Sequence, residues 1–465
     1  MVSLHDHEGE LDRILKRVGR HTSFAEVMAE GSHGETVTID TKSHRATTSP
    51  RLAGAVIRAW AGTRWVEAAA SDFDRASLDA AVEGLEQELK NAGSIGPPPG
   101  ISATTVGNAD EVPRRPMRDM GLEREMEYAR DLFGWTIAVP GIKNAQVGVV
   151  WWDDERLYLN TAGARCHHTS CRVRAGLVGI AVENGLSEYD YTASGGIGGQ
   201  EFLEEMNETS ARAIAQSAIE LLHAKAPPTG SMSVLLDEGT TGTFAHESFG
   251  HGTEADQFVR DRSYLKPLLG QMLGPESLTI ADDGSIPRAW GSVPFDDEGH
   301  PAEKTMLIDH GRFVGALHDR DSAAALHATA TGNTRRSDFL SRPYVRMTNI
   351  YVEPQDWSFE ELVKEAGDGV VLEHWTSGME DPLGGQMQLK VRRGRRIEHG
   401  QLTDVVSSMA LSGSVLAFLR DIRGIGKSEG PTRIETGFCG KGHGDYLPTG
   451  DGGPYLLSRA VVGPA

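Results

Sequence analysis

The segment TGTFAHESFGHGTEAD contains two histidines and a glutamate at a spacing that could support metal chemistry. His246 and His251 offer imidazole nitrogens, which zinc favours as ligands, and Glu247 directly follows the first histidine. A carboxylate beside a zinc ion can receive a proton from water that the ion activates. The three residues therefore supply two candidate ligands and one candidate base.

The spacing of the two histidines does not suit a regular α-helix. Positions five apart lie roughly 140° from each other around a helix axis, so their side chains diverge. A π-bulge would bring both imidazoles to one face, and Gly250 could instead let the chain leave helical geometry. Two interpretations remain open: a metal site built by one of these devices, or a chance pattern with His246 satisfied inside a helix and His251 exposed.

A catalytic zinc site needs a third protein ligand, and Cys439 is the candidate. It lies in TGFCGKGHGDYLPTG, a glycine-rich stretch that we expect to form a loop in which the backbone can approach a site closely. Two imidazoles and one thiolate form a soft donor set, which favours zinc over magnesium or calcium. His443 of the same stretch could donate a hydrogen bond in the transition state, or act as a fourth ligand in a structural site.

Other side chains near these motifs have two possible roles. Glu254 could accept the free N–H of a ligating imidazole, or it could be a solvated carboxylate, whereas Asp256 is predicted to face solvent. The segment CHHTSC at 166–171 offers thiols and imidazoles, but the sequence has no second cysteine pair with which to complete a zinc site. A structural strand is the favoured interpretation of that segment.

The composition limits the classes of function. Lys and Arg number 46 against 66 Asp and Glu, and the formal net charge of −20 disfavours contact with nucleic acid. The basic run RRGRR at 392–396 is short and is predicted to be a solvated hairpin tip. Three cysteines argue against a disulfide framework, and we find neither an apolar leader nor a membrane-spanning run. We therefore expect a cytoplasmic protein.

The elements that would position these residues form an α+β protein of two domains. Residues 1–226 are predicted to be an α/β N-terminal domain, in which a Gly- and Pro-rich linker covers about 91–113. The segment AKAPPTG marks the boundary to a β-rich C-terminal domain at 227–465, rich in short strands broken by glycine. This second domain would carry the metal site on a helix and on the glycine-rich loop.

Within the first domain, residues 11–29 show helical spacing with a turn at Gly19. Two separate strands are expected near 144–152 and 157–159, and helical periodicity returns over 202–223.

Several blocks together resemble the TldD/PmbA peptidase family. HESFGHGTEAD is similar to the family's H-E-x-x-x-H signature, and SGGIGG resembles its Gly-rich turn. GSVPFDDEGHPAEKTMLIDHGRFVGALHDR resembles the D-D-E-G strand pair, and TGNTRRSDFLSRPYVRMTNIYVEP the T-G-N-x-R-R and R-M-T-N segments. GFCGKGHGDYLPTG is similar to the terminal Cys-Gly-Lys loop, and the blocks follow the expected order across almost the whole chain.

The resemblance implies a zinc-dependent peptidase that acts on peptides or unfolded polypeptides. One Zn²⁺ would be held by His246, His251 and Cys439, and Glu247 would be the general base toward water. The family's other subunit type, PmbA or TldE, lacks the metal motif, so this chain resembles the catalytic TldD side. The implied assembly is a heterodimer with a PmbA/TldE-like subunit, or else a homodimer.

Departures from the family pattern concern the substrate. The stretch after Cys-Gly-Lys reads GHGDY in place of the usual Gly-Gln and small residue, and GGQMQ at 384–388 loses an acidic residue. Both changes favour a relative specialised for a small peptide or a natural-product intermediate. The alternative is a non-catalytic, partner-binding subunit with a structural metal, although a carboxylate directly after the first histidine favours an enzyme.

Overall fold

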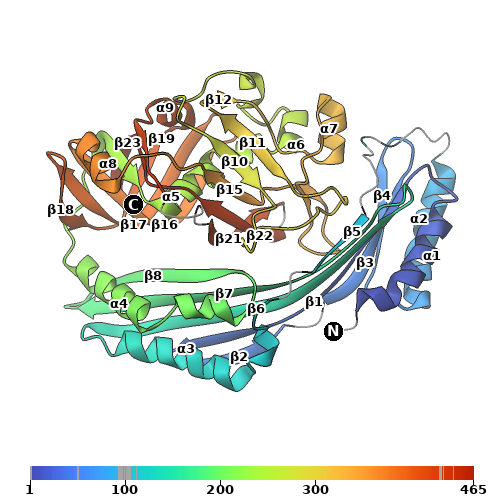
Figure 1. Ribbon diagram of the computed structural model, residues 1–465, viewed down its shortest axis with the longest axis horizontal. Coiled ribbons are helices and arrows are strands. Elements are labelled where there is room, and N and C mark those ends of the chain that lie inside the picture. Colours follow the sequence, from blue (N-terminus) through green and yellow to red (C-terminus); the bar gives the residue numbers. More distant parts are fainter. Residues whose placement is uncertain are drawn as a thin grey trace.

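The computed structural model of the chain shows a mixed α/β protein with more strand than helix (Figure 1). Its N-terminal half forms a long curved sheet, and its C-terminal half lies over the concave face of that sheet, which gives a two-domain arrangement. The structure describes residues 3–49, 52–92, 98, 100, 106–110, 113–428, 432, 434–442 and 445–465.

The N-terminal half is built on an eight-stranded sheet with the order β4-β3-β1-β6-β7-β5, to which β2 adds beside β1 and β8 beside β7. All neighbours are antiparallel except β5 and β7, which are parallel. The strands cover Ala25–Asp40 (β1), His44–Thr48 (β2), Leu52–Trp60 (β3), Trp65–Ala70 (β4), Val106–Asp110 (β5), Ile142–Asn160 (β6), Arg165–Glu183 (β7) and Leu186–Ile197 (β8).

Helices cover the convex face of this sheet in two pairs (Figure 1). In α1, apolar side chains recur with helical spacing at Leu11, Ile14, Leu15 and Val18, and all four are buried against one end of the sheet. A second pair packs against β6, β7 and β8 and closes another core. The helices are Glu8–Val18 (α1), Arg75–Asn91 (α2), Leu122–Ile137 (α3) and Glu208–Leu222 (α4).

Three local expectations for this half were wrong. The helical spacing predicted over 11–29 ends at Val18, and the chain then enters β1 at Ala25. The two strands predicted near 144–152 and 157–159 are one 19-residue strand, β6. The predicted linker at 91–113 contains the strand β5, while residues 93–97, 99, 101–105, 111 and 112 lie outside the described residues.

The C-terminal half contains two larger sheets. One has six strands in the order β12-β11-β10-β15-β22-β21, and the other follows β16-β9-β23-β19-β17-β18 and closes on itself because β16 also pairs with β17. Between them lies the main core, formed mostly by Leu, Ile, Val and Phe side chains. The strands are Gly230–Leu236 (β9), Ile280–Asp283 (β10), Lys304–Asp309 (β11), Arg312–Phe313 (β12), Thr334–Arg335 (β13), Tyr344–Val345 (β14), Asn349–Val352 (β15), Gly369–Glu380 (β16), Gln386–Glu398 (β17), Gln401–Val406 (β18), Met409–Ser414 (β19), Gly424–Ile425 (β20), Ile434–Lys441 (β21), Asp445–Gly452 (β22) and Leu456–Pro464 (β23).

Short helices connect these strands. They are Glu238–Thr243 (α5), Ala255–Val259 (α6), Arg320–Leu326 (α7), Phe359–Ala366 (α8) and Val415–Arg420 (α9). Among the described residues, no helix is both long enough and apolar enough to cross a membrane.

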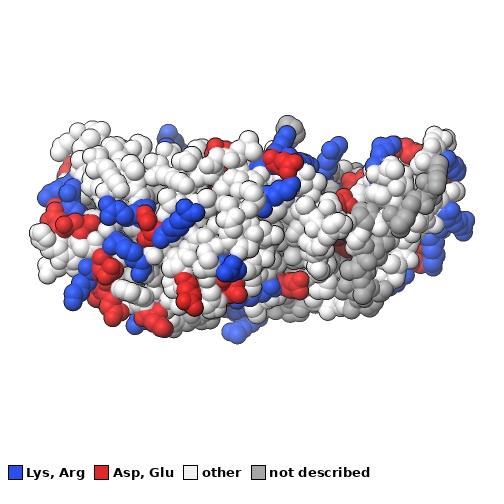
Figure 2. Space-filling view, turned by 90° about the horizontal axis from the view of Figure 1, so that it is seen from above, with Lys and Arg blue, Asp and Glu red and all other residues white. Residues whose placement is uncertain are grey.

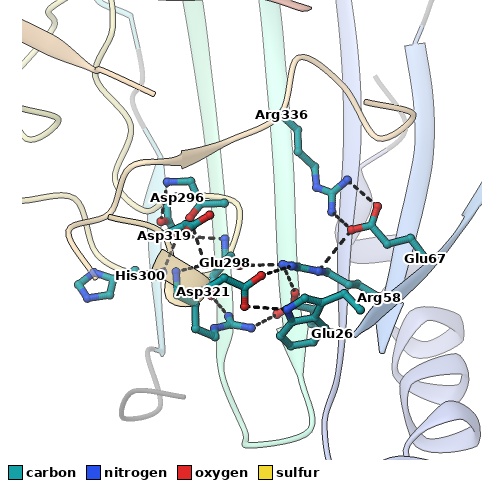
Figure 3. A network of polar contacts seen from close by, with 12 residues as sticks. Glu26, Arg58, Glu67, Asp296, Glu298, His300, Asp319, Asp321 and Arg336 are labelled. Carbon is teal, nitrogen blue, oxygen red and sulfur yellow. Dashed lines mark hydrogen bonds and ion pairs between the residues drawn. The ribbon is translucent and has the colours of Figure 1, made fainter. Parts of the chain in front are cut away.

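Buried ion pairs join the two halves (Figure 3). Arg58 of β3 donates from Nη1 to Glu298 Oε1 at 2.7 Å, and Arg320 of α7 donates to Glu26 Oε2 of β1 at 3.0 Å. All four residues are at most 8% exposed, so each charge depends on its partner across the interface. This network fixes how the C-terminal half sits on the sheet.

The basic run at 392–396 lies inside β17, so the expectation of a hairpin tip was wrong. Arg393 lies 3.3 Å from Glu220, and Arg395 donates from Nε to Glu373 at 2.8 Å. On the face shown in Figure 2, Lys and Arg side chains of the described residues likewise lie among Asp and Glu side chains. The run is neutralised within the protein and is unsuited to contact phosphates.

Candidate metal centre

The two motif histidines lie on a helix that changes its winding between them. The chain leaves β9, forms α5, and continues directly into a π-helical turn over Phe244–Phe249 (η4). A 3₁₀ turn over Gly250–Thr253 (η5) follows. The π turn places the imidazole ring centroids of His246 and His251 only 5.0 Å apart. The predicted π-bulge is therefore present, and the pattern is not a pair of diverging side chains.

The β21–β22 hairpin brings Cys439 to these histidines. Its Sγ lies 3.3 Å from Nε2 of His251. One ligand atom from each of His246, His251 and Cys439 can be chosen so that all three lie within 4.8 Å of one another, and this is the metal-like cluster found among the described residues. Cys439 lies in the strand β21, which pairs with β22 at Leu447, so the expectation of a glycine-rich loop was wrong at this position.

A buried carboxylate holds the first imidazole. His246 is 2% exposed, and its Nδ1 lies 2.6 Å from Oδ1 of Asp451 on β22. Its Nε2 is buried and has no hydrogen-bond partner in the described part of the chain. A ligating histidine characteristically binds a carboxylate through one ring nitrogen and the metal through the other, and His246 is arranged in this way.

Glu254 holds the second imidazole in the same manner. Its Oε2 lies 3.4 Å from Nδ1 of His251, which leaves Nε2 directed toward Cys439. Glu254 is 1% exposed, so of its two possible roles the solvated carboxylate is excluded. Burial raises its pKa, but Lys441 and His251 outweigh burial and lower the pKa to about 2. It is therefore a permanent anion beneath the site.

Lys441 neutralises two carboxylates, Glu254 and Asp256. Its Nζ donates to Glu254 at 2.8 Å, to Asp256 at 2.9 Å and to the carbonyl of Val345 at 3.0 Å. The Asp256 side chain is 12% exposed, so the prediction that it faces solvent was wrong. The lysine stands two positions after Cys439 on the same strand, so its side chain projects on the same side as the thiol.

The cluster favours a thiolate. Burial alone raises the pKa of Cys439, yet the imidazoles of His246 and His251 outweigh it and lower the pKa to about 5. Burial alone lowers the pKa of His251, but Glu254 and Cys439 outweigh burial and raise this pKa to about 10. The pKa of His246 is likewise raised, because Asp451 and Cys439 outweigh burial, so without a cation both imidazoles favour their protonated form. A divalent cation would replace the added proton of each ring, since zinc ligands are deprotonated thiols and neutral imidazoles.

Glu247 follows His246 and lies beside the cluster. Its Oε2 is 4.0 Å from Nε2 of His251, and its side chain is 33% exposed, which leaves it accessible from solvent. Burial raises its pKa more than His246 and His251 lower it. The strand β16 passes close by, because a Cβ on Gly378 would lie 2.7 Å from that of Glu247. A carboxylate with a raised pKa is suited to accept a proton and release it.

The remaining candidates from the sequence are His443 and the cysteines of the segment 166–171. His443 lies outside the described residues. Cys166 and Cys171 are buried in β7, where burial raises both thiol pKa values, and they contribute to separate apolar clusters. The structural interpretation of 166–171 thus agrees with a regular strand.

Sequence reasoning missed Asp451 and Lys441. Both lie close to Cys439 along the chain, but their partners stand 205 and 187 positions away, at His246 and Glu254. The one available signal was the density of charged residues after Cys439, which is unusual in a buried hairpin.

Known proteins resemble this chain over nearly its full length. Residues 229–462 match the family described as PmbA/TldA metallopeptidase C-terminal domain, and residues 115–225 match the PmbA/TldA metallopeptidase central domain. A metalloprotease of Archaeoglobus fulgidus is 34% identical over 82% of this chain and 87% of its own. A metalloprotease of Methanothermobacter thermautotrophicus is 30% identical over 97% and 98%. The chain belongs to the TldD/PmbA metallopeptidase family.

Further relatives agree with this assignment. A protein of Saccharolobus solfataricus named zinc metalloprotease TldD homolog is 29% identical over 52% of this chain and 54% of its own. Among solved structures, TldE of Thermococcus kodakarensis has a TM-score of 0.76 at 16% identity, covering 98% of this chain and 100% of that one. A Thermotoga maritima structure gives a TM-score of 0.77 at 19% identity, covering 98% and 99%. At such identities these two show the fold alone.

Proposed function

We propose that the chain is a zinc-dependent peptidase that hydrolyses amide bonds in peptides or unfolded polypeptides. The observation that carries the proposal is the buried cluster of His246, His251 and Cys439, whose ligand atoms lie within 4.8 Å of one another. The partnerless Nε2 of His246 and the acidified thiol fit a soft divalent cation. The names of several relatives include metalloprotease, and one includes zinc.

In this proposal each side chain has a separate task. A bound zinc ion would supply Lewis acidity, which polarises a carbonyl and brings the pKa of water toward about 7. Glu247 accepts a proton from water on its solvent-facing side and passes it to the leaving amine. Asp451 and Glu254 hold the imidazoles of His246 and His251 in the tautomer that leaves each Nε2 available.

The proposed substrate is an extended peptide. Gly378 lets the backbone of β16 approach Glu247 with no side chain between them, which would favour recognition of a main chain. A small peptide or a natural-product intermediate fits the altered sequence after Cys439 and at 384–388.

We also propose a PmbA/TldE-like subunit as partner, with a homodimer as the alternative, because a TldE structure shares this fold. We place the boundary between the N-terminal and the C-terminal domain between residues 226 and 227.

The alternative is a partner-binding subunit with a structural metal. A structural zinc site has four protein ligands and no open position. Against it stands Glu247, whose side chain is 33% exposed beside the cluster and contributes no ligand atom to it. A carboxylate in that place has no purpose in a closed site.

Glu247→Gln separates these possibilities. The zinc-loaded variant should retain about one zinc per chain while hydrolysis of an unfolded protein or a peptide mixture falls by roughly 10²- to 10⁴-fold. Glu303→Gln, an exposed residue elsewhere, is the matched control and should retain full activity. Products are identified by mass spectrometry, with and without a PmbA/TldE-like subunit. Turnover of Glu247→Gln at the wild-type rate would contradict the role of the base.

A further inference from the structure

A second polar cavity lies on the other side of the hairpin that carries Cys439. It has a volume of about 210 Å³ and is enclosed between the concave face of the N-terminal sheet and the β21–β22 hairpin. Phe438 and Pro448 of the hairpin line it. Because neighbouring side chains of a strand point to opposite faces, Phe438 faces this cavity while Cys439 faces the candidate metal centre. The two sites are therefore distinct.

Three arginines line the cavity, and one of them has no ion-pair partner among the residues that the structure describes. Arg156 lies 2.6 Å from Asp297, and Arg172 donates to two backbone carbonyls with Asp154 at 3.9 Å. Arg335 is 5% exposed and donates from Nη1 to two carbonyl oxygens, at 3.0 and 2.8 Å. It forms no ion pair with any residue that the structure describes.

The carboxylates beside the cavity form their ion pairs with the other two arginines. Arg156 pairs with Glu30, Asp154 and Asp297, and Arg172 lies 3.9 Å from Asp154. Within the described part of the chain, Arg335 is the guanidinium of this wall that is left without an ion-pair partner. Burial and the nearby Arg172 lower its pKa, as expected for an uncompensated cation.

Further polar atoms in the wall make no hydrogen bond with a described residue, although Arg156 Nε lies 3.6 Å from Asp154 Oδ2 in an ion pair. Within the described part of the chain, no hydrogen bond is made by four buried atoms: Glu30 Oε2, Arg156 Nε, His168 Nδ1 and Ser337 Oγ. All four belong to residues that line the cavity. Buried polar groups in folded proteins are nearly always satisfied, so a set of orphans around one cavity indicates a polar ligand.

The rest of the wall is apolar and reaches solvent. Trp152 of the sheet packs against Phe438 of the hairpin with ring centroids 6.3 Å apart, and Leu52 and Tyr446 also line the wall. Phe438 is 50% exposed and Tyr446 65% exposed, which marks the mouth. A ligand entering here would place an apolar group beside the aromatic side chains and a polar group at the arginines.

We propose that this cavity binds a small ligand that carries one carboxylate and an apolar group. The carboxylate pairs with Arg335, which has no ion-pair partner among the described residues, and accepts a hydrogen bond from Ser337 Oγ. Such a group is found at the C-terminus of a peptide and in a free organic acid. The inference stands apart from the proposed peptidase activity, because it concerns binding at the opposite face of the hairpin.

The test is calorimetric titration of the full-length, zinc-loaded chain with N-acetyl-L-leucine, N-acetyl-L-leucine amide and inorganic phosphate. A carboxylate could also coordinate zinc, so the titration is repeated on protein stripped of metal. Two variants accompany the wild type. Arg335→Met removes the charge, and Ser337→Ala removes a hydroxyl that has no internal partner, so its fold should be unaffected.

One molecule of N-acetyl-L-leucine should bind per chain, both with and without zinc. It should bind at least about tenfold more tightly than the amide. Ser337→Ala should weaken binding by about 3- to 10-fold and Arg335→Met by more. Phosphate binding as tightly as the acid would show that the site takes any small anion, which contradicts the apolar component. Binding that disappears with zinc, is unchanged in both variants, or is absent in the wild type would overturn the proposal. None of these outcomes depends on hydrolysis.

Discussion

Asp451 Oδ1 lies 2.6 Å from Nδ1 of His246, and both residues are buried. This pair connects the π-helical turn to the β22 strand, which is also the partner of the strand that carries Cys439. The candidate ligands are thus supported from two elements that fold against each other. The orientation of the first imidazole depends on a residue that makes no contribution to the ligand set itself.

Asp451→Asn should therefore weaken zinc binding. The amide can still reach Nδ1, but it no longer favours the orientation of the imidazole ring or increases the ring's basicity toward a metal. Loss of such a partner typically costs 10- to 100-fold in metal affinity. Competition with a zinc chelator of known affinity measures the change. Asp421→Asn, at an exposed position without a side-chain partner, should bind zinc as the wild type does. Equal affinity in both variants would show that Asp451 has no role in the site.

Gly250 should tolerate no side chain, because the turn after the π-helix is packed tightly. A Cβ there would lie 2.2 Å from Met347 Sδ and 2.8 Å from Ile350 Cδ1. Gly250→Ala is expected to cost roughly 1–3 kcal/mol of unfolding free energy and to weaken zinc binding. Gly84→Ala is the matched helical control: its Cβ meets no atom within 4 Å, so the change should stabilise by about 0.4–1 kcal/mol. Urea unfolding with chelator present measures both.

Lys441→Met should destabilise the chain strongly. It removes the cation from between Glu254 and Asp256, which leaves Asp256 without this cation and Glu254 with only Arg346 and His251. A loss of about 3 kcal/mol is expected from urea unfolding of metal-free protein. Lys225→Met breaks an exposed pair with Asp404 and should change stability by at most about 1 kcal/mol. A similar small effect at Lys441 would contradict a buried network.

The stability of the N-terminal half should depend on pH through Glu125. Its Oε1 accepts from Trp151 Nε1 at 3.0 Å, and burial raises its pKa to about 7 from an ordinary 4.5. The folded state therefore retains a proton that the unfolded chain has released. This contribution to stability is fully present below about pH 4.5 and is lost as pH rises through about 7, by at most about 1.4 kcal/mol per pH unit.

Glu125→Gln isolates that contribution. The difference in unfolding free energy between wild type and variant should decline between pH 5 and 7 and become constant above pH 8, as measured by urea unfolding across that range. Glu123→Gln, on the exposed side of the same helix, should show no such trend. A constant difference at Glu125 would mean that this carboxyl group is ionised in the folded protein.

If the two histidines bind one ion, their spacing leaves two possible geometries, a π-bulge or an exit from the helix at Gly250, because few backbone conformations bring positions five apart onto one face. The strand β21 was not predicted, because glycines around Cys439 suggest a loop when its partner β22 is not known. Phe24, Val27 and Met28 have helical spacing, yet all are buried in or next to β1, where both faces of the strand are covered. Periodicity cannot separate a fully buried strand from a helix.

Charged residues caused the other errors. The run Asp153 to Arg156 interrupts an apolar pattern and suggested a break, but β6 continues through it because Arg156 pairs with Asp297 and Glu155 with His167. These partners come from other elements, at separations up to 141 positions. Asp256 and Asp451 were misjudged or missed for the same reason. Pairing between distant charges is a property of the fold and has no local signal in the sequence.

We propose that His246, His251 and Cys439 hold one zinc ion. The most direct test of this proposal is elemental analysis by mass spectrometry of protein purified without chelator, comparing wild type, Cys439→Ser and Cys166→Ser, the last being a buried cysteine far from the cluster along the chain. We predict about one zinc per chain in the wild type and in Cys166→Ser, and little or none in Cys439→Ser. Equal zinc in all three proteins, or none in the wild type, would contradict the account.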